Sequence, residues 1–435
     1  MRAGREQTIA GVVAVLLVGE ACGGVGLPDD ERWSSEHFVF HTRNAERDAC
    51  ADILPLLEQH FATMQAFLGF TWPQGRVIDY YKFVDQGDLN GHSDCTAVAC
   101  GARSRVESAS AFDPYDLIHA YLAPTGDPMP LIADGTALAV TCAMANWTRS
   151  TASAETVLGL ADTSPDLYSA GGWLVSYLID QFGPAKLLEI YGQLPPGSTE
   201  AQADALFTTV YGVTFADVWG AASAEETSRN VCPWECSQPA IAIDGGPQDT
   251  QTGACGQSYV ERTFSATAGE NVIVSSDGAG FGVGSCGPHA DIPAAYNVGG
   301  VGGASIYNLP GGDYFLDYSS QPGTITLASA SDTALATSCP AGATGAVAGF
   351  DTVSLFVPRS AQSWFLPIGW SPGRSVFVNP STAGARAFLC PSCATDPELC
   401  PVAQDGVYQP LTSVGDIRFD VDPSVPMSAF ILLVR

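Results

Sequence analysis

Residues 112–122 of this 435-residue chain read FDPYDLIHAYL, and this stretch decides how the N-terminal half is expected to fold. Asp113 is a favoured N-cap, Pro114 suits the first helical position, and Asp116 completes an arrangement that resembles a capping box. The apolar residues that follow predict a helix that runs to about Leu122. The start of this helix therefore has a structural explanation that needs no ligand.

His119 is the residue of this helix that points to chemistry. Zinc peptidases of the common helical type place two histidines four residues apart, so that both imidazoles face one metal ion, with a glutamate base after the first histidine. If His119 is the second histidine, Tyr115 occupies the position of the first and Asp116 the position of the base. A third ligand from a later helix falls in LIADGTALAV (131–140), at Asp134.

Further segments on both sides of this helix follow the order found in one peptidase family. They are SSEHFVFHT (34–42), AFLGF (66–70), IDYYKF (78–83), PLIADGTALAV (130–140), YSAGGWLVSYLIDQFGPAKLLEIY (168–191) and VYGVTFADVWGAA (210–222). Over roughly residues 32–228, the chain resembles the peptidase MA-like, gluzincin-type zinc metallopeptidases of exported bacterial proteins. The resemblance implies a zincin-like α+β domain over residues 30–232, in which Tyr168 is a vestigial catalytic residue that packs near the active site.

The chain departs from that family at the residues that carry catalysis. Tyr115 replaces a histidine, and a neutral phenol with a pKa of about 10 is a poor zinc ligand. Asp116 replaces the glutamate base with a shorter arm, and a large loss of rate is expected because general-base geometry tolerates little displacement. Asp134 is likewise shorter than the family's glutamate, and His119 alone is retained.

Two functions follow from this pattern, beside a purely structural envelope role. In the first, the domain is a pseudoenzyme without a cofactor that binds a protein or surface partner, and His119 is a hydrogen-bonded core histidine. In the second, the domain is a divergent zinc-dependent metallopeptidase with His119, Asp134 and His92 as ligands and Asp116 as the base. The loss of the first histidine favours the pseudoenzyme.

The other histidines are expected to pack rather than to bind a metal. His37 and His41 flank a predicted strand and should lie at its ends. His60 and His289 are expected at the surface or in side-chain packing.

The first 22 residues are typical of an export signal. Arg2 and Arg5 give a positive start, and residues 9–18 form an apolar run too short to cross a bilayer. The segment ends Gly-Glu-Ala before Cys22, which permits either a lipoprotein signal with Cys22 acylated or ordinary cleavage after the alanine. The chain has 13 cysteines, and setting Cys22 aside leaves an even number to pair in an oxidising compartment. We therefore expect a lipid-anchored protein of the bacterial outer membrane or cell surface.

The charge balance limits the partners of the chain. Its net charge is −28, from 18 basic and 46 acidic residues, which excludes nucleic acid because phosphate binding needs a basic face. Membrane contact is expected only through the lipidated N-terminus.

Composition divides this multidomain chain near residue 232. Before that point, helices are expected over about 51–68, 131–147, 167–182, 184–194, 199–211 and 214–228, with strands at 36–42 and 76–84. After it, short alternating runs between glycine- and proline-rich turns predict an all-β region of two β-sandwiches, at 236–340 and 346–435. The expected boundary is PAGATGAVA (340–348). A short loop between Cys95 and Cys100 predicts a local disulfide.

Overall fold

The computed structural model describes residues 26–43, 50, 52–95, 99–141, 150–160, 164–225 and 231–246, and from residue 248 to residue 434 mainly the strands. Helices and strands both occur in these residues, so the expected mixed α+β class is confirmed. The export signal with Cys22 and the expected boundary at 340–348 lie outside the described residues.

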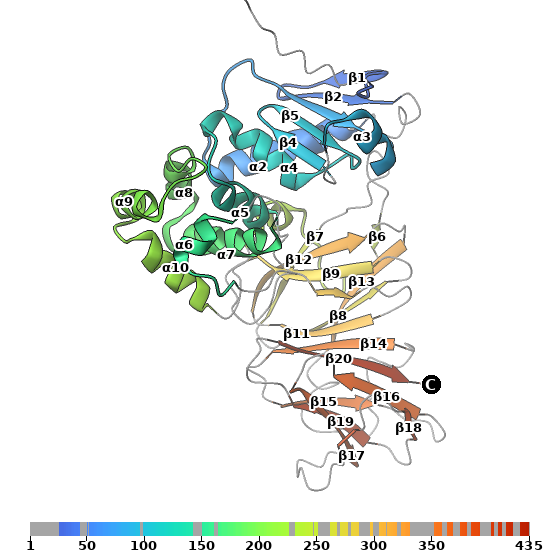
Figure 1. The fold of residues 1–435 in the computed structure, drawn as a ribbon. Coiled ribbons are helices and arrows are strands. Elements are labelled where there is room, and N and C mark those ends of the chain that lie inside the picture. Colours follow the sequence, from blue (N-terminus) through green and yellow to red (C-terminus); the bar gives the residue numbers. More distant parts are fainter. Residues whose placement is uncertain are drawn as a thin grey trace, which may run out of the picture.

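The N-terminal unit contains a five-stranded mixed sheet (Figure 1). Its order is β1 (Glu31–Ser34), β2 (Phe38–Thr42), β3 (Ile78–Lys82), β5 (Arg105–Ser108) and β4 (Ala99–Ala102). Strands β2, β3 and β5 run parallel, and the two outer strands pair antiparallel to their neighbours. Every residue of β2 is buried, as expected for a central parallel strand covered on both faces. Strand β4, at the end of the strand order, is an edge strand of this sheet.

The helices of the N-terminal unit form mainly from well-capped amphipathic segments. They are α2 (Ile53–Leu68), α3 (Gln86–His92), α4 (Pro114–Leu122), α5 (Pro130–Val140), α6 (Ala154–Leu158), α7 (Pro165–Phe182), α8 (Pro184–Tyr191), α9 (Glu200–Tyr211) and α10 (Phe215–Ala224), with short 3-10 turns η2 (Ala123–Thr125) and η4 (Glu235–Ser237). Helix α9 begins with a full capping box between Thr199 and Gln202. Helix α5 ends at Val140, before the expected end at Trp147, and residues 142–149 lie outside the described range.

Two glycines set the distance between helices α5 and α7. A Cβ atom on Gly135 would lie 2.4 Å from the carbonyl oxygen of Gly171, and one on Gly171 would lie 2.7 Å from that of Leu131. The two backbones therefore touch, which only glycine permits at such a crossing. This crossing brings Asp134 on α5 close to the helix that carries Tyr168.

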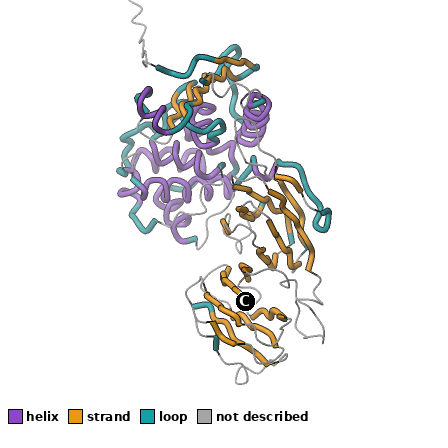
Figure 2. Tube along the Cα trace, turned by 90° about the vertical axis from the view of Figure 1, so that its right-hand side faces the viewer, coloured by secondary structure: helices purple, strands orange, loops and turns teal. Residues whose placement is uncertain are grey.

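The C-terminal region consists of strands (Figure 2). They are β6 (Gln248–Thr250), β7 (Arg262–Ala266), β8 (Glu270–Ser276), β9 (Gly280–Ser285), β10 (Tyr296–Val298), β11 (Ala304–Leu309), β12 (Gly312–Ser319), β13 (Gly323–Ala330), β14 (Thr352–Pro358), β15 (Ser363–Ile368), β16 (Ser375–Pro380), β17 (Arg386–Pro391), β18 (Tyr408–Pro410), β19 (Gly415–Asp420) and β20 (Met427–Val434). They form sheets of order β10-β9-β12-β7, β18-β16-β20-β14-β11-β8-β13-β6 and β15-β19-β17.

A buried apolar cluster lies between the first two of these sheets. Phe264, Phe281 and Tyr314 enter it from the four-stranded sheet, and Val272 and Leu327 enter from the eight-stranded sheet. Side chains that alternate inward from two sheets are the packing of a β-sandwich.

One sheet continues across the expected boundary between the two sandwiches. Strand β11 pairs parallel with β14, so Ala304 lies opposite Val353 and Tyr307 opposite Phe356. The division at 340–348 stays a prediction, but a shared eight-stranded sheet joins the strands on either side of it.

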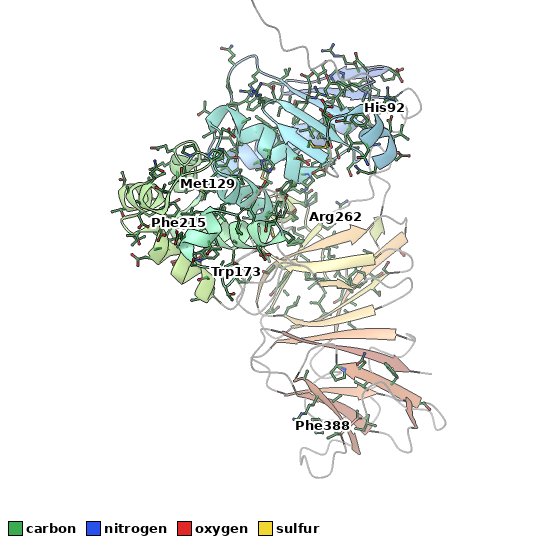
Figure 3. All side chains as sticks on the ribbon, viewed as in Figure 1. His92, Met129, Trp173, Phe215, Arg262 and Phe388 are labelled. Atoms are coloured by element: carbon green, nitrogen blue, oxygen red, sulfur yellow. A yellow bond between two sulfur atoms is a disulfide. The ribbon has the colours of Figure 1, made fainter. Side chains whose placement is uncertain are left out.

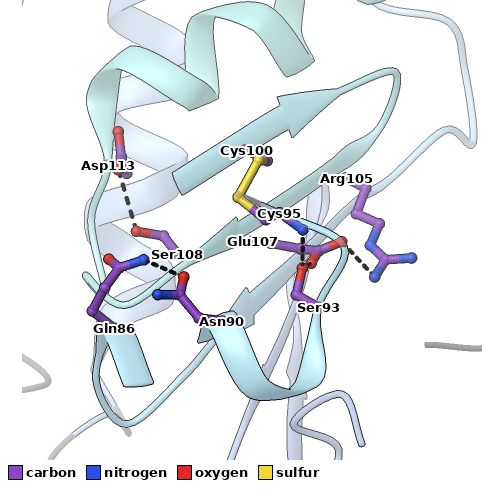
Figure 4. The surroundings of a disulfide bond; sticks show 9 residues. All are labelled: Gln86, Asn90, Ser93, Cys95, Cys100, Arg105, Glu107, Ser108 and Asp113. Atoms are coloured by element: carbon purple, nitrogen blue, oxygen red, sulfur yellow. Dashed lines mark hydrogen bonds and ion pairs between the residues drawn. A yellow bond between two sulfur atoms is a disulfide. The ribbon is translucent and has the colours of Figure 1, made fainter. Parts of the chain in front are cut away.

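The connection between the N-terminal unit and the strands is held by several contacts. Trp234 belongs to the core of the N-terminal unit, and Cys236, two residues later, forms a disulfide with Cys286 after β9. The backbone N–H of Asp244 then donates to the carbonyl of Leu327 on β13. The predicted disulfide between Cys95 and Cys100 is confirmed (Figure 4).

No helix in the described part of the chain is long and apolar enough to cross a membrane.

Candidate functional site

Helix α4 starts at the predicted N-cap, and of the predicted capping-box-like arrangement the structure shows the half in which Asp113 accepts from Asp116. The Asp113 carboxylate accepts the backbone N–H of Asp116 at 3.2 Å and, through its other oxygen, the hydroxyl of Ser108 at 3.2 Å (Figure 4). Pro114 is the first residue of the helix. Asp113 therefore fixes the end of α4 to strand β5, and so sets the position of the residues that follow.

Tyr115, His119 and Asp134 lie together between α4 and α5. The Tyr115 hydroxyl donates to Asp134 Oδ1 over 2.8 Å, and His119 Nε2 lies 3.3 Å from the same oxygen. The rings of Tyr115 and His119 meet edge to face, with centroids 5.0 Å apart. We call these three residues the tyrosine–histidine–aspartate triad. The positions that the spacing predicted as first ligand, second ligand and third ligand are thus neighbours in space.

The triad retains some access to solvent. The side chains of His119 and Asp134 are each 16% exposed, and Tyr115 is partly buried against the core. Burial, and then the negative charge of Asp134, raise the pKa of Tyr115 far above its usual range, so its hydroxyl keeps the proton that it donates. A protonated phenol presents a hydrogen where the family's first histidine presents a lone pair, and its hydrogen bond is accepted by the Asp134 oxygen that also lies 3.3 Å from His119 Nε2. The residues present therefore do not fit the zinc site of the resembled family.

Asp116, the candidate base, is 7% exposed and faces strand β4. Burial raises its pKa to about 7, with a further increase from the charge of Asp113, while His119 and the backbone N–H of Gly101 oppose the shift. Gly101 lies so close to α4 that a Cβ atom there would be 2.3 Å from the Asp116 carbonyl oxygen. The Asp116 carboxylate is thus hydrogen-bonded to an edge strand.

Asp113 behaves as the partner of Asp116. Its pKa is also raised, chiefly by burial, while hydrogen bonds from the Asp116 and Tyr115 backbone and from Ser108 oppose the shift. A buried and a half-buried carboxyl group three residues apart therefore each disfavour the charge of the other.

Tyr168 on α7 lies close enough to Tyr115 for the two phenols to interact electrostatically. Its side chain is partly buried against the core of the N-terminal unit. The structure therefore brings Tyr168 to the neighbourhood of the triad.

His92, the third ligand of the divergent-enzyme hypothesis, lies elsewhere. It is the last residue of α3, and its Nδ1 is 2.9 Å from Asp88 Oδ1. Figure 3 shows it beside the sheet, apart from Met129 at the start of α5. Within the described residues, no group of three or more His, Cys, Asp or Glu side chains is arranged to hold a metal ion.

The remaining described histidines pack, as the sequence predicts for His37 and His41. His37 Nδ1 lies 2.7 Å from Glu58 and its ring stacks on Phe61. His41 lies between Asp29 and Asp79, at 2.7 and 3.2 Å. His60 is fully buried, with Nδ1 2.9 Å from the Tyr121 hydroxyl.

Strand β4 and Gly101 are the parts of the site that sequence reasoning missed. Strands β4 and β5 have four residues each and include Gly101 and charged residues, so neither gives an alternating apolar pattern. The Cys95–Cys100 disulfide, which ends one residue before Gly101, is the one signal that a compact structure precedes α4.

No known protein family and no curated protein matches this sequence. Among solved structures, part of the chain is similar to the pre-peptidase C-terminal domain of a collagenase from Bacillus anthracis, at 16% sequence identity. The match covers 22% of this chain and 95% of that domain, with a TM-score of 0.18. Overlap at this level carries no conclusion about fold or activity.

Proposed function

We propose that this chain is an exported envelope lipoprotein whose N-terminal unit is a degenerate metallopeptidase-like domain. In this proposal the domain no longer catalyses zinc-dependent hydrolysis and binds a protein or surface partner. Zinc is not its cofactor, and the C-terminal strands display the domain or extend its binding surface.

The hydrogen bond from Tyr115 to Asp134 carries this proposal. In a zinc peptidase, the first and third ligand positions converge on a metal because each presents a lone pair. Here the first position presents a proton, and the third position accepts it over 2.8 Å. The Asp134 carboxylate therefore has a hydrogen-bond donor in Tyr115 and a second polar neighbour in His119, so it has partners within the protein without a metal ion.

Restoring the ligands provides the test. The triple variant Tyr115→His, Asp116→Glu, Asp134→Glu recreates the family's ligand and base types on the same backbone. We expect the natural protein to bind no stoichiometric zinc and the triple variant to bind about one equivalent, measured by metal analysis after dialysis. Tyr115→Phe is the matched control, because it removes the hydroxyl without adding a ligand. Stoichiometric zinc in the natural protein, with casein cleavage that depends on Asp116, would overturn the proposal.

Disulfides support the export part of the proposal. Cys95–Cys100 and Cys236–Cys286 are bonded, and Cys50 and Cys232 are disulfide-bonded as well. Disulfides persist in oxidising compartments such as the periplasm and cell surface. The mass of the mature N-terminal peptide decides between an acylated Cys22 and a free amino terminus.

A divergent zinc peptidase is the second candidate, and one observation favours it. Asp116 has a pKa raised to about 7, chiefly by burial, which is a useful value for a general base near neutral pH. His119 and Asp134 would be the ligands. This candidate requires that His119→Ala abolish both zinc binding and proteolysis, and it fails if the natural protein retains no zinc at micromolar excess.

A further inference from the structure

The folded N-terminal unit begins very close to Cys22. Arg43 donates to the carbonyl oxygens of Gly26 and Leu27, the latter over 3.3 Å, and also pairs with Asp88 on α3 at 3.3 Å. A Cβ atom on Gly26 would lie 2.5 Å from the His92 ring, and Leu27 packs against the cluster of Phe83, Leu89 and Cys95. Gly26 and Leu27 are therefore fixed beside helix α3.

Only four peptide steps separate Cys22 from Gly26. A fully extended chain covers at most about 3.6 Å per residue, so this connection spans no more than about 14 Å. A compact unit of about 200 residues is roughly 40 Å across. The connection is shorter than the unit is wide, so an anchor at Cys22 cannot reach the bilayer unless the face that carries Gly26 is turned towards it.

The C-terminal strands lie at the opposite end of the molecule. Figures 1 and 2 are related by a turn about the vertical axis, and in both the N-terminal sheet lies at the top and the strands extend downward. Figure 3 places His92 near the upper end and Phe388, on β17, near the lower end.

We propose that Cys22 anchors the protein in one fixed orientation, with the face formed by residues 26–31 and helix α3 apposed to a lipid bilayer and the C-terminal strands pointing away. This inference rests on the proposed lipidation of Cys22. The partner of the face is the membrane surface. The second group of strands, around β15, β17 and β19, is then the part most distant from the membrane and the part available to partners in solution.

Charge defines the character of this contact. The face carries Asp30 and Glu31 at the start of β1 and Asp85 at the start of α3, whereas Asp88 is paired with Arg43 and Asp29 lies against His41. Acidic groups are repelled by anionic lipid, so the face approaches the membrane because it is tethered and not because it adsorbs. A long flexible connection between Cys22 and Gly26 should therefore allow this face to move away from the membrane.

Fluorescence resonance energy transfer from a donor in the protein to an acceptor dye in the membrane tests the orientation. The mature chain is coupled through its N-terminal Cys22 to a lipid thioester and incorporated in phosphatidylcholine vesicles that contain an acceptor dye on the headgroup. A fluorescent amino acid that serves as the donor replaces either Val84 or Val402. Val84 is 47% exposed beside α3, and Val402 is 57% exposed and forms a β-bridge with Phe388. We expect severalfold more efficient transfer from position 84 than from position 402.

The matched control inserts 20 glycine and serine residues between Val25 and Gly26, which gives a root-mean-square reach of roughly 25 Å. We expect this insertion to remove most of the difference between the two positions. Equal transfer from both positions with the natural connection would overturn the proposal, and so would a difference that survives the insertion. Because the lipid is attached chemically, this result judges the orientation alone, whereas the mass of the natural N-terminus judges the proposed lipidation.

Discussion

His60 and His119 each lie beside a tyrosine of helix α4, yet their surroundings differ in one respect that decides what each pair can do. His60 is fully buried, and its Nδ1 meets the neutral hydroxyl of Tyr121. His119 is 16% exposed and shares a carboxylate, Asp134, with Tyr115. The first pair is a packing element without charge, whereas the second is a polar triad next to two further carboxyl groups.

The comparison shows why residue types alone do not identify a site. Phe112 and Trp234 surround His60 edge to face, and burial lowers its pKa to about 3. An imidazole in such a place stays neutral and contributes by filling volume. The triad has acidic groups and partial access to solvent, which are the properties of a place where binding or chemistry occurs.

Replacing His60 should produce the largest loss of stability. His60→Ala leaves a cavity beneath Trp234 and removes the partner of the Tyr121 hydroxyl, which should cost about 3 kcal/mol in the free energy of unfolding. Urea unfolding of the oxidised protein measures this loss. His119→Ala is the matched comparison and should cost well under half as much, since that ring is not enclosed. Equal losses for the two variants would show that the triad is as much a core element as His60.

The pH dependence of stability should differ in sign between the two regions. The folded pKa of Asp116 is about 7, above its usual value of 3.8, so the folded state binds more protons between these values. The stability contributed by this group is therefore greatest at low pH and is lost as the pH rises from about 4 to 7. His60 acts in the opposite sense: its folded pKa is about 3 against 6.5, so stability is lost as the pH falls from about 6.5 to 3.

Asp116→Asn should isolate the first of these effects. Asparagine keeps an oxygen for the Gly101 N–H but has no charge to bury. The stability of the variant minus that of the natural protein should therefore be greater at pH 8 than at pH 5, by on the order of 1–2 kcal/mol. Urea unfolding at both pH values measures the change. Ser153→Ala, which removes the exposed N-cap of α6 without removing a titratable group, is the control that should leave the slope unchanged. An unchanged slope in the Asp116 variant would mean that its carboxyl is not held above its usual pKa.

Tyr115→Phe should have a smaller effect. It removes the hydrogen bond to Asp134 from a partly buried site, which should cost about 1 kcal/mol in unfolding free energy. The same variant should leave His60 and the core around Tyr121 undisturbed, as judged by hydrogen exchange of α2 and α4. A variant as stable as the natural protein would show that the phenol and the carboxylate are not paired in solution.

Helical spacing placed Tyr115 and His119 together, whereas Asp134, on another helix, was expected near them only from the resembled family's third-ligand position. Residues 115 and 119 must lie on one face of a helix, and the caps at Asp113 and Pro114 fixed where that helix starts. Spacing does not say which atoms meet, so the donation from Tyr115 to Asp134 came only from the structure. The contact of Gly101 with α4 and the parallel pairing of β11 with β14 were likewise beyond prediction, because both join segments that no local pattern links.

The disulfide between Cys236 and Cys286 has a mechanical consequence. It closes a covalent loop that contains β6, β7, β8 and β9, and its two cysteines are 50 positions apart in the sequence. Tension applied between the N-terminal unit and Arg435 passes through the sulfur–sulfur bond and bypasses these four strands. Under load, the molecule should lengthen first in its later strands, while the segment next to the helices stays folded until the bond is reduced.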